Sequence, residues 1–279
     1  MLDKQKRFWS RVSALALLTL TGWGPAEAQA IKSVAVTSIV EHPALDAVRD
    51  GVKEALAQAG YVEGKNLKWQ YQTAQGNAGT AGQIARKFVG DRPDVIVAIS
   101  TTSTQALLAA SKTIPIVFSA VTDPVAGQLT PSWEATGSNV TGVSNALDLN
   151  RQLAVMRQIL PQAKRVGVVY NPGEANSASV IQQLRVLLPQ QGMSLVEAAA
   201  PRSVDVGTAA RSLVGKVDLF YTNNDNGVMS AYESIAKVAN DARIPLLSAD
   251  TDSVKRGAVA AYGIDYHALG LQTGAMVLR

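Results

Sequence analysis

The chain of 279 residues contains no cysteine, only two histidines and 5% aromatic residues. Without cysteine it has no disulfide framework, no lipidation site of a lipoprotein and no thiolate metal ligand. The two histidines, His42 and His267, lie far apart in the sequence, and neither has an evident partner to orient it as a catalytic base. We therefore expect no transition-metal site, no cofactor and no enzymatic activity.

Two stretches approach catalytic motifs without completing them. Residues 60–66 are one residue short of a phosphate-binding loop and follow a helical pattern instead of a strand. Residues 142–146 approach the nucleophile elbow of serine hydrolases but lack its final glycine. A secreted hydrolase is thus an alternative that needs a positioned base for Ser144, and the sequence offers none.

The N-terminus has the pattern of a secretory signal peptide. Basic side chains precede a short apolar run at residues 12–20, and alanines with A-x-A spacing follow up to Ala30. This run falls well short of the ~20 apolar residues that span a bilayer, which disfavours a membrane anchor. We expect residues 1–30 to be removed by cleavage near Ala30 and the remaining chain to be periplasmic.

The charge of the remaining chain is nearly balanced. The formal net charge is +4, but residues 1–30 hold four basic and two acidic side chains, which leaves 22 basic and 20 acidic ones. A balanced charge without basic runs argues against nucleic acid as a partner. The length after cleavage suits one large domain or two of ordinary size.

The sequence repeats one pattern at long range. Val-Ala-Val at residues 34–36 corresponds to Val-Gly-Val at 166–168, and an aspartate precedes an apolar run at both 94 and 218. Ile-Pro followed by a hydrophobic strand pattern occurs at both 114 and 244. Offsets of 124–132 residues are too long for a solenoid. They predict two copies of one βα domain, with a ligand cleft between them.

Short Val/Ile-rich runs alternate with helical patterns, which is typical of βαβ units. The sequence predicts strands at residues 33–37, 67–71, 95–100, 116–119, 166–170, 194–198, 219–223, 246–249 and 259–262. Helices are expected to begin near residues 44, 79, 103, 150, 175, 206, 228 and 266. The predicted fold class is α/β, with two similar doubly wound parallel-sheet lobes joined by a hinge.

Two passages connect the lobes. A Gly/Ser/Asn-rich stretch at residues 131–145 is the expected linker, and the chain is expected to return near residues 251–257. The predicted domains are lobe 1, residues 31–145 with 258–279 returning to it, and lobe 2, residues 146–257. The sequence stops at Arg279 inside a helical pattern that no Gly, Asn or Pro ends, so we expect a truncated C-terminus.

Ligands of doubly wound sheets bind at the carboxyl ends of the strands, and the first lobe offers hydroxyl groups there. Ser100, Thr101 and Thr102 follow a predicted strand at the start of a helix. Hydroxyls beside the free N–H groups of a helix start can receive a carboxylate. Ordinary N-capping is the alternative, because serine and threonine are common caps.

The second lobe offers acidic and amide groups at the same position. Glu174, Asn176 and Ser177 follow one predicted strand, and Asn224 and Asp225 follow another. We expect Asp225 to be the counter-charge of a ligand ammonium, with Glu174 as its competitor. Turn formation is the alternative for both loops.

Other strand-end loops complete the candidate set. The further polar or backbone ligand contacts expected are His42, Ser119, Ala120, Asp123 and Asp250. An apolar wall is expected from Val40, Ala44 and Leu45. For His42, a helix cap or a surface position is the alternative to a ligand contact.

The sequence resembles a known family at these loops. The matching motifs are Glu-His-Pro-Ala-Leu-Asp at residues 41–46, Val-Thr-Asp-Pro at 121–124, Asn-Val-Thr-Gly-Val-Ser at 139–144, Tyr-Asn-Pro-Gly-Glu-Ala-Asn-Ser at 170–177 and Gly-Ala-Val-Ala-Ala-Tyr-Gly at 257–263. Together they resemble the substrate-binding proteins of ABC importers, in the branch associated with tryptophan and tyrosine uptake. The resemblance extends from residue 31 to residue 279.

The resemblance implies a type I periplasmic-binding fold, with two lobes, three hinge crossings and a ligand clamped between them. It also implies an aromatic or apolar amino acid as ligand, an ABC permease in the inner membrane with its ATPase as partners, and a monomer. The chain departs from the family at residues 135–139, where Ala-Thr-Gly-Ser-Asn replaces the usual Pro-Gly-Gly-Asn. The family's final hinge segment would follow Arg279.

Two further functions fit the same fold. A ligand-sensing domain that feeds a membrane receptor differs only in its partners. A sugar-binding or regulatory member would favour stacking aromatics or a DNA-binding headpiece, and the loops of this chain contain few aromatics. A thermal-shift screen against amino acids discriminates among these ligand classes, because a ligand that binds the folded state raises the melting temperature.

Overall fold

The computed structural model describes residues 31–134 and 137–279, whose strands form two parallel sheets. The predicted signal peptide, residues 1–30, lies outside the described residues. Across the described part of the chain, no helix is both long and apolar enough to span a membrane.

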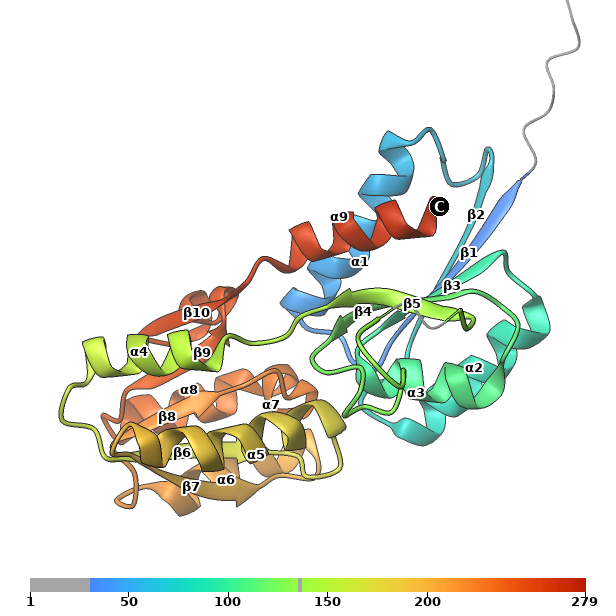
Figure 1. The fold of residues 1–279 in the computed structure, drawn as a ribbon. Helices are drawn as coiled ribbons and strands as arrows, with labels where there is room; N and C mark the ends of the chain where they lie inside the picture. Colours follow the sequence, from blue (N-terminus) through green and yellow to red (C-terminus); the bar gives the residue numbers. More distant parts are fainter. Residues whose placement is uncertain (1–30, 135–136) are drawn as a thin grey trace, which may run out of the picture. The chain divides into compact units, whose positions relative to one another are not determined.

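Lobe 1 is built on a five-stranded sheet with the order β2-β1-β3-β4-β5. Its strands are β1 (Lys32–Ser38), β2 (Leu67–Thr73), β3 (Val95–Ile99), β4 (Ile116–Val121) and β5 (Val140–Ser144). Its helices are α1 (Pro43–Gln58), α2 (Ala78–Asp91), α3 (Thr101–Ala110) and, from the end of the sequence, α9 (Tyr266–Val277). Figure 1 shows α9 lying against α1, far from the elements that precede it in the sequence.

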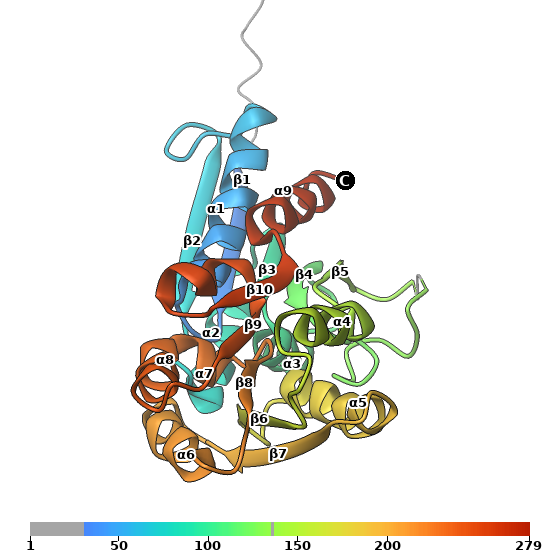
Figure 2. The same cartoon turned by 90° about the vertical axis from the view of Figure 1, so that its left-hand side faces the viewer.

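Lobe 2 repeats this arrangement. Its strands are β6 (Arg165–Tyr170), β7 (Ser194–Ala199), β8 (Leu219–Thr222), β9 (Leu246–Asp250) and β10 (Ala260–Ile264). Its helices are α4 (Leu149–Ile159), α5 (Ala175–Gln190), α6 (Val206–Leu213), α7 (Asn226–Ser230) and α8 (Tyr232–Asp241), with short 3₁₀ turns at Ser203–Asp205 and Thr251–Arg256. Figure 2 shows the strands in the order β10-β9-β8-β6-β7.

The two sheets have equivalent topologies. Counted from the start of each lobe, both orders are 2-1-3-4-5, and every pairing within them is parallel. This is one of the two common doubly wound orders, in which ligands bind where the strand order reverses. The predicted α/β class with two similar parallel-sheet lobes is confirmed.

Most predicted strands agree with the structure within two residues, because their apolar runs are buried on both sheet faces. In β3, every residue from Val95 to Ile99 is buried, as expected for a strand covered by helices on both sides. The central β6 shows the same pattern, with Val166, Val168 and Val169 fully buried.

The predicted lobe boundaries need two corrections. Residues 131–145 are not linker throughout, because β5 forms there and pairs with β4. The return near residues 251–257 is also wrong, because β10 still pairs with β9 in lobe 2. The crossings therefore lie between β5 and α4, and between β10 and α9.

The repeated aspartate has the same structural role in both lobes. Asp94 Oδ2 accepts hydrogen bonds from the backbone N–H of Ser33 at 2.7 Å and from its hydroxyl at 2.8 Å. Asp218 Oδ2 accepts from the N–H groups of Lys164 and Arg165, both at 2.8 Å. Each aspartate thus ties the start of the third strand of its lobe to the start of the first.

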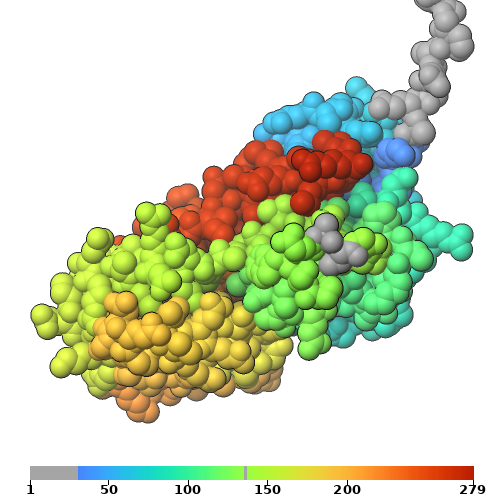
Figure 3. Space-filling model, viewed as in Figure 1, coloured from blue at the N-terminus to red at the C-terminus, as the bar shows by residue number. Residues whose placement is uncertain are grey.

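Helix α9 joins lobe 1 through a close backbone contact. A Cβ atom at Gly270 would lie 2.3 Å from the carbonyl oxygen of Val48, and one at Gly51 would lie 2.5 Å from the carbonyl oxygen of His267. Only glycine fits these two positions, because a methyl group would overlap the facing backbone. In Figure 3 the red C-terminal helix lies directly beside the blue surface of α1.

Candidate ligand-binding site

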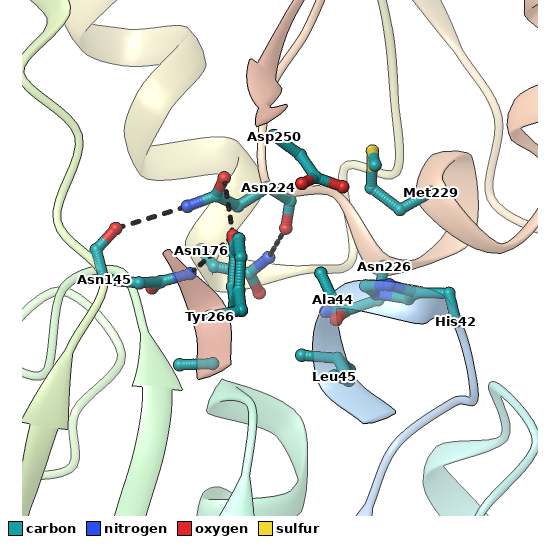
Figure 4. A pocket seen from close by; sticks show the side chains of 11 residues that line it. His42, Ala44, Leu45, Asn145, Asn176, Asn224, Asn226, Met229, Asp250 and Tyr266 are labelled. Carbon is teal, nitrogen blue, oxygen red and sulfur yellow. Dashed lines mark hydrogen bonds between the residues drawn. The ribbon is translucent and has the colours of Figure 1, made fainter. Parts of the chain in front are cut away.

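A pocket lies where the carboxyl ends of the strands in the two lobes face each other. It contains about 320 Å³ of empty space, including the part open to solvent. Its lining residues, shown in Figure 4, are His42, Ala44, Leu45, Ala120, Asn145, Asn176, Asn224, Asn226, Met229, Asp250 and Tyr266.

His42 is a buried pocket residue and not a helix cap. It occupies the N-cap position of α1, but its side chain makes no capping hydrogen bond. The side chain is only 8% exposed, and its Nδ1 has no hydrogen-bond partner among the described residues. Burial, together with the positive charge of Arg256, lowers the pKa of His42 to about 3. The ring is therefore neutral at physiological pH.

The first turn of α3 places unpartnered hydroxyls beside free backbone N–H groups. Ser100 and Thr101 are almost fully buried, and neither hydroxyl has a partner within residues 31–134 and 137–279; the same holds for Ser103. The first N–H groups of a helix have no partner inside the helix. Ser100 has a φ of 85°, a strained conformation for a residue other than glycine. The arrangement is suited to an anion.

This helix start lies next to the pocket. The N–H of Ser100 donates to the carbonyl oxygen of Ser119 at 2.9 Å, and Ala120, the next residue along β4, lines the pocket. Ala120 has a φ of 54°, and the pairing of β4 with β5 shifts register there. The backbone is thus irregular where the pocket begins.

The loops of lobe 2 bond to one another. Glu174 Oε2 accepts from the backbone N–H of Asn226 at 2.9 Å and from its side-chain Nδ2 at 2.6 Å, while Oε1 accepts from the N–H of Gly227 at 3.0 Å. Asn176 Nδ2 donates to Glu174 Oε2 and to the carbonyl oxygen of Asn224. Glu174 therefore fixes the loop after β8 to the start of α5.

The carboxylate of Asp225 likewise accepts hydrogen bonds from backbone N–H groups of lobe 2. Its Oδ1 accepts from the N–H of Val228 at 2.9 Å, which makes it the cap of α7, and its Oδ2 accepts from the N–H of Asn171 at 2.6 Å. Burial and the neighbouring Glu174 carboxylate raise the pKa of Asp225, while these backbone donors act in the opposite direction. Asp225 is fully buried and does not line the pocket.

Asp250 is the acidic residue that lines the pocket. It ends β9, and its Oδ1 caps the following 3₁₀ turn by accepting from the N–H of Asp252 at 3.1 Å. Burial raises the pKa of Asp250. Figure 4 shows its carboxylate between the side chains of Asn224 and Met229.

Amides and one phenol join the lobes beside the pocket. Asn224 of lobe 2 donates to the carbonyl oxygen of Asn145 at 3.3 Å and to the hydroxyl of Thr122 at 3.4 Å. Asn145 Nδ2 donates to the Tyr266 hydroxyl at 3.1 Å, which in turn donates to Asn224 Oδ1 at 3.4 Å. Because Asn145 and Tyr266 flank the two crossings, this network lies at the hinge.

The structure brings only part of the predicted set to the pocket. Of the predicted ligand contacts, five line it: His42, Ala120, Asn176, Asn224 and Asp250. Ala44 and Leu45 of the predicted apolar wall also line it, and Val40 packs on the core of lobe 1.

The other predicted contacts lie outside the lining. Ser119 bonds to the hydroxyl of Thr273 at 2.7 Å, and Asp123 Oδ1 accepts from the N–H groups of Val125 and Ala126. Ser177 donates to Asn223 Oδ1 at 3.4 Å. These contacts are internal to one lobe. Ser100, Thr101, Thr102, Glu174 and Asp225 are likewise absent from the lining.

Four lining residues were not predicted. Asn226 and Met229 belong to α7, and the run Asn-Asn-Asp-Asn at residues 223–226 already marked this loop. Asn145 and Tyr266 flank the crossings, and correct placement of β5 and β10 would have revealed them.

Two similar lobes with a pocket between facing strand ends define a two-lobed solute-binding protein of the type I periplasmic-binding fold. The chain belongs to the family of ABC transporter substrate binding proteins, whose pattern it matches over residues 33–279. The function of this family is solute binding, not catalysis.

Three relatives illustrate this similarity. The tyrosine-binding protein of Clostridioides difficile is 40% identical over 248 residues, which cover 89% of this chain and 72% of the relative. A conserved domain protein from Vibrio cholerae has 48% identity and a TM-score of 0.87, covering 88% of this chain and 83% of that one. An ABC domain from Streptococcus pneumonia in complex with L-Trp has 26% identity and a TM-score of 0.86, covering 89% and 84%.

A third solved structure, in an open form, is less similar to this chain. A substrate-binding protein from Clostridium difficile in a ligand-free, open form has 40% identity but a TM-score of only 0.65, at coverages of 89% and 84%. It therefore resembles this chain less in structure than the L-Trp complex does, although it resembles it more in sequence.

Proposed function

We propose that this chain is the exported substrate-binding protein of an ABC importer and that it clamps one aromatic amino acid, tyrosine or tryptophan, between its lobes. The observation that carries this proposal is the pocket itself, which combines the carboxylate of Asp250 with the apolar side chains of Leu45 and Met229. A tyrosine-binding relative and a structural neighbour in complex with L-Trp support the choice of ligand.

The two charges of the ligand contact opposite lobes in this proposal. Asp250 receives the ammonium group, because it is the carboxylate in the pocket lining, and it takes the role that the sequence suggested for Asp225. The carboxylate binds in this proposal at the start of α3, beside the pocket residue Ala120, where free N–H groups and the unpartnered hydroxyls of Ser100 and Thr101 lie just outside the pocket lining. A zwitterion bound to both lobes favours the closed arrangement over the open one.

The similarity scores support a closed arrangement of the described unit. Higher identity together with a lower TM-score points to a different placement of the lobes, because homologous lobes keep their folds. The hydrogen bonds of Asn224 to Thr122 and Asn145 are consistent with lobes held together.

Membership of the family supports the proposed export and the proposed partners. Residues 1–30 act as the cleaved signal peptide in this proposal, and the mature chain is a periplasmic monomer that delivers its ligand to an ABC permease. Intact-mass measurement of the periplasmic protein tests the export step. Full-length protein recovered in the cytoplasm contradicts it.

Calorimetry on the purified chain tests ligand class and site together. We expect 1:1 binding of tyrosine or tryptophan and none of glucose. Asp250→Asn keeps the capping oxygen but removes the charge, so we expect affinity to fall at least ~30-fold, since truncating one partner of a buried charge pair costs about 2 kcal/mol or more. The matched control is Asp252→Asn, two residues away and paired with Lys255 at the surface. Equal affinity in both variants would remove Asp250 from the site.

A further inference from the structure

Two pocket-lining residues, His42 and Asn176, have a buried side-chain polar atom without a partner in the described structure, and His42 is the one that lies among apolar neighbours. It is 8% exposed, lies in the loop between β1 and α1, and has a buried Nδ1 without a hydrogen-bond partner in the described structure. Buried polar atoms in folded proteins nearly always have a partner, so an orphan of this kind calls for an explanation. Its position also rules out the usual structural explanation, because the side chain does not cap α1.

The ring is suited to a neutral polar group. Because the pKa of His42 is lowered to about 3, the ring carries one N–H and one lone pair at neutral pH. It can therefore donate to an oxygen or accept from an O–H or N–H. It is poorly suited to a ligand ammonium, for which Asp250 provides the negative charge in the same pocket.

The neighbours of His42 are apolar. Ala44 and Leu45 follow it in the sequence and line the same pocket, and Met229 is contributed by the opposite lobe. A methionine thioether and aliphatic groups contact the faces and edges of aromatic rings favourably. An aromatic side chain held by these three residues would have the His42 ring as a polar neighbour.

We propose that His42 is a specificity-determining residue that hydrogen-bonds the polar atom of the ligand's aromatic side chain, the phenol hydroxyl of tyrosine or the indole N–H of tryptophan. The proposal rests on the proposed function and adds to it a selection against phenylalanine. Phenylalanine has the same apolar ring but leaves the buried nitrogen without a partner. Sites built to bond a hydroxyl or N–H discriminate strongly against the analogue that lacks it.

The test compares three amino acids on two proteins. By calorimetry, the unmodified chain should bind tyrosine and tryptophan at least ~10-fold more tightly than phenylalanine. In His42→Leu the affinity for tyrosine and tryptophan should fall by about that factor, and the affinity for phenylalanine should stay constant or rise. The matched control is His267→Leu, because His267 is exposed and contacts Glu54 at 3.0 Å. It should keep the original preference.

The outcomes separate the two proposals. If the unmodified chain binds none of the three amino acids, the proposed function fails. If it binds them but His42→Leu keeps the preference, or weakens all three equally, the role of His42 is refuted.

A second measurement does not depend on the fold of a variant. In the ¹⁵N NMR spectrum of the unmodified chain, tyrosine should shift the ring nitrogens of His42 and phenylalanine should not. Equal shifts with both amino acids would overturn the inference.

Discussion

The two lobes share a topology but use the polar residues at their strand ends differently. In lobe 1, Ser100, Thr101 and His42 bury polar atoms that have no partner among the described residues. In lobe 2, Glu174 and Asp225 accept hydrogen bonds through all four carboxylate oxygens from the loops around them. The two carboxylates of lobe 2 are thus satisfied internally, and Asn176 Oδ1 is the atom of its pocket lining that is buried without a partner in the described structure. Lobe 1 leaves more such bonds for a ligand to make, at His42, Ser100 and Thr101.

This difference separates stability from binding. A buried polar atom that loses its partner costs about 1–3 kcal/mol, whereas removal of an atom that never had a partner costs little in the free protein. We therefore expect substitutions in the loops of lobe 2 to lower stability first. Substitutions of the unpartnered groups in lobe 1 should lower affinity first.

Glu174→Ala should have the largest effect. It removes the acceptor of two backbone N–H groups and two side-chain amides, so we expect a loss of several kcal/mol in the free energy of unfolding. Urea denaturation measures this loss. The control is Glu63→Ala, whose exposed pair with Lys53 should contribute about 0–1 kcal/mol. A Glu174→Ala protein as stable as the control would refute the internal role of these loops.

The pH dependence of stability should show that the pKa of His42 is lowered in the folded protein. Its pKa is about 3 in the folded protein and 6.5 ordinarily, so between these values the unfolded chain binds a proton that the folded chain does not. Stability from this group is therefore complete above pH 6.5 and is lost as the pH falls towards 3, with a slope of about 1.4 kcal/mol per pH unit.

The difference between the unmodified chain and His42→Leu isolates this slope from the carboxylates, which titrate in both proteins. As the pH is lowered from 7 to 4, the unfolding free energy of the unmodified chain should fall relative to that of His42→Leu. Parallel curves would mean that His42 is not held neutral by burial.

Asp225→Ala should destabilise lobe 2 by about 2 kcal/mol, because α7 loses its cap and the N–H of Asn171 loses its acceptor. Ligand affinity should change less than in Asp250→Asn. Thermal unfolding of both variants measures the loss of stability, and calorimetry measures which of the two loses more ligand affinity. A normal melting temperature with lost binding would restore Asp225 as the partner of the ammonium group.

The smallest effect expected is that of Thr101→Val. The unpartnered hydroxyl disappears, so the stability of the free protein should hold or rise, while ligand affinity should fall about tenfold. The matched control is Thr104→Val in the same helix, which removes a hydroxyl that has a partner. The Thr104 hydroxyl donates to the carbonyl oxygen of Ser100 at 2.8 Å. That variant should lose about 1 kcal/mol of stability. Equal stability losses would contradict the contrast between partnered and unpartnered hydroxyls.

The sequence predicted most strands of both sheets well, but it placed the two crossings between the lobes at the wrong residues. A glycine in β5 and a glycine in β10 explain these two errors. Gly142 read as linker, but a Cβ there would lie 2.2 Å from the carbonyl oxygen of Phe118, so it is the close-packed centre of β5. A Cβ at Gly263 in β10 would lie 1.7 Å from the carbonyl oxygen of Ala249. Glycine signals both a turn and a close approach, and one sequence does not distinguish them.

The sequence predicted which loops form the site, but not which residues of those loops line the pocket. Asp225 and Asp250 both follow a strand of lobe 2, so the sequence alone does not rank them. What separates them is that Asp225 bonds to Asn171, which is 54 residues away in the sequence. Likewise, the five hydroxyl residues from Ser100 to Thr104 look alike, but the Thr104 side chain bonds within its own helix.

The contact between α1 and α9 has a consequence for the order of folding. Lobe 2 runs without interruption from α4 to β10, whereas lobe 1 needs residues from both ends of the described chain. The glycine contact of α9 with α1 cannot form until residues 266–277 have been synthesised. Lobe 1 therefore has the more non-local contacts and should fold later, although its first strand leaves the ribosome first. In a chain exported as proposed, this delay would keep the N-terminal half unfolded for passage through the translocation pore.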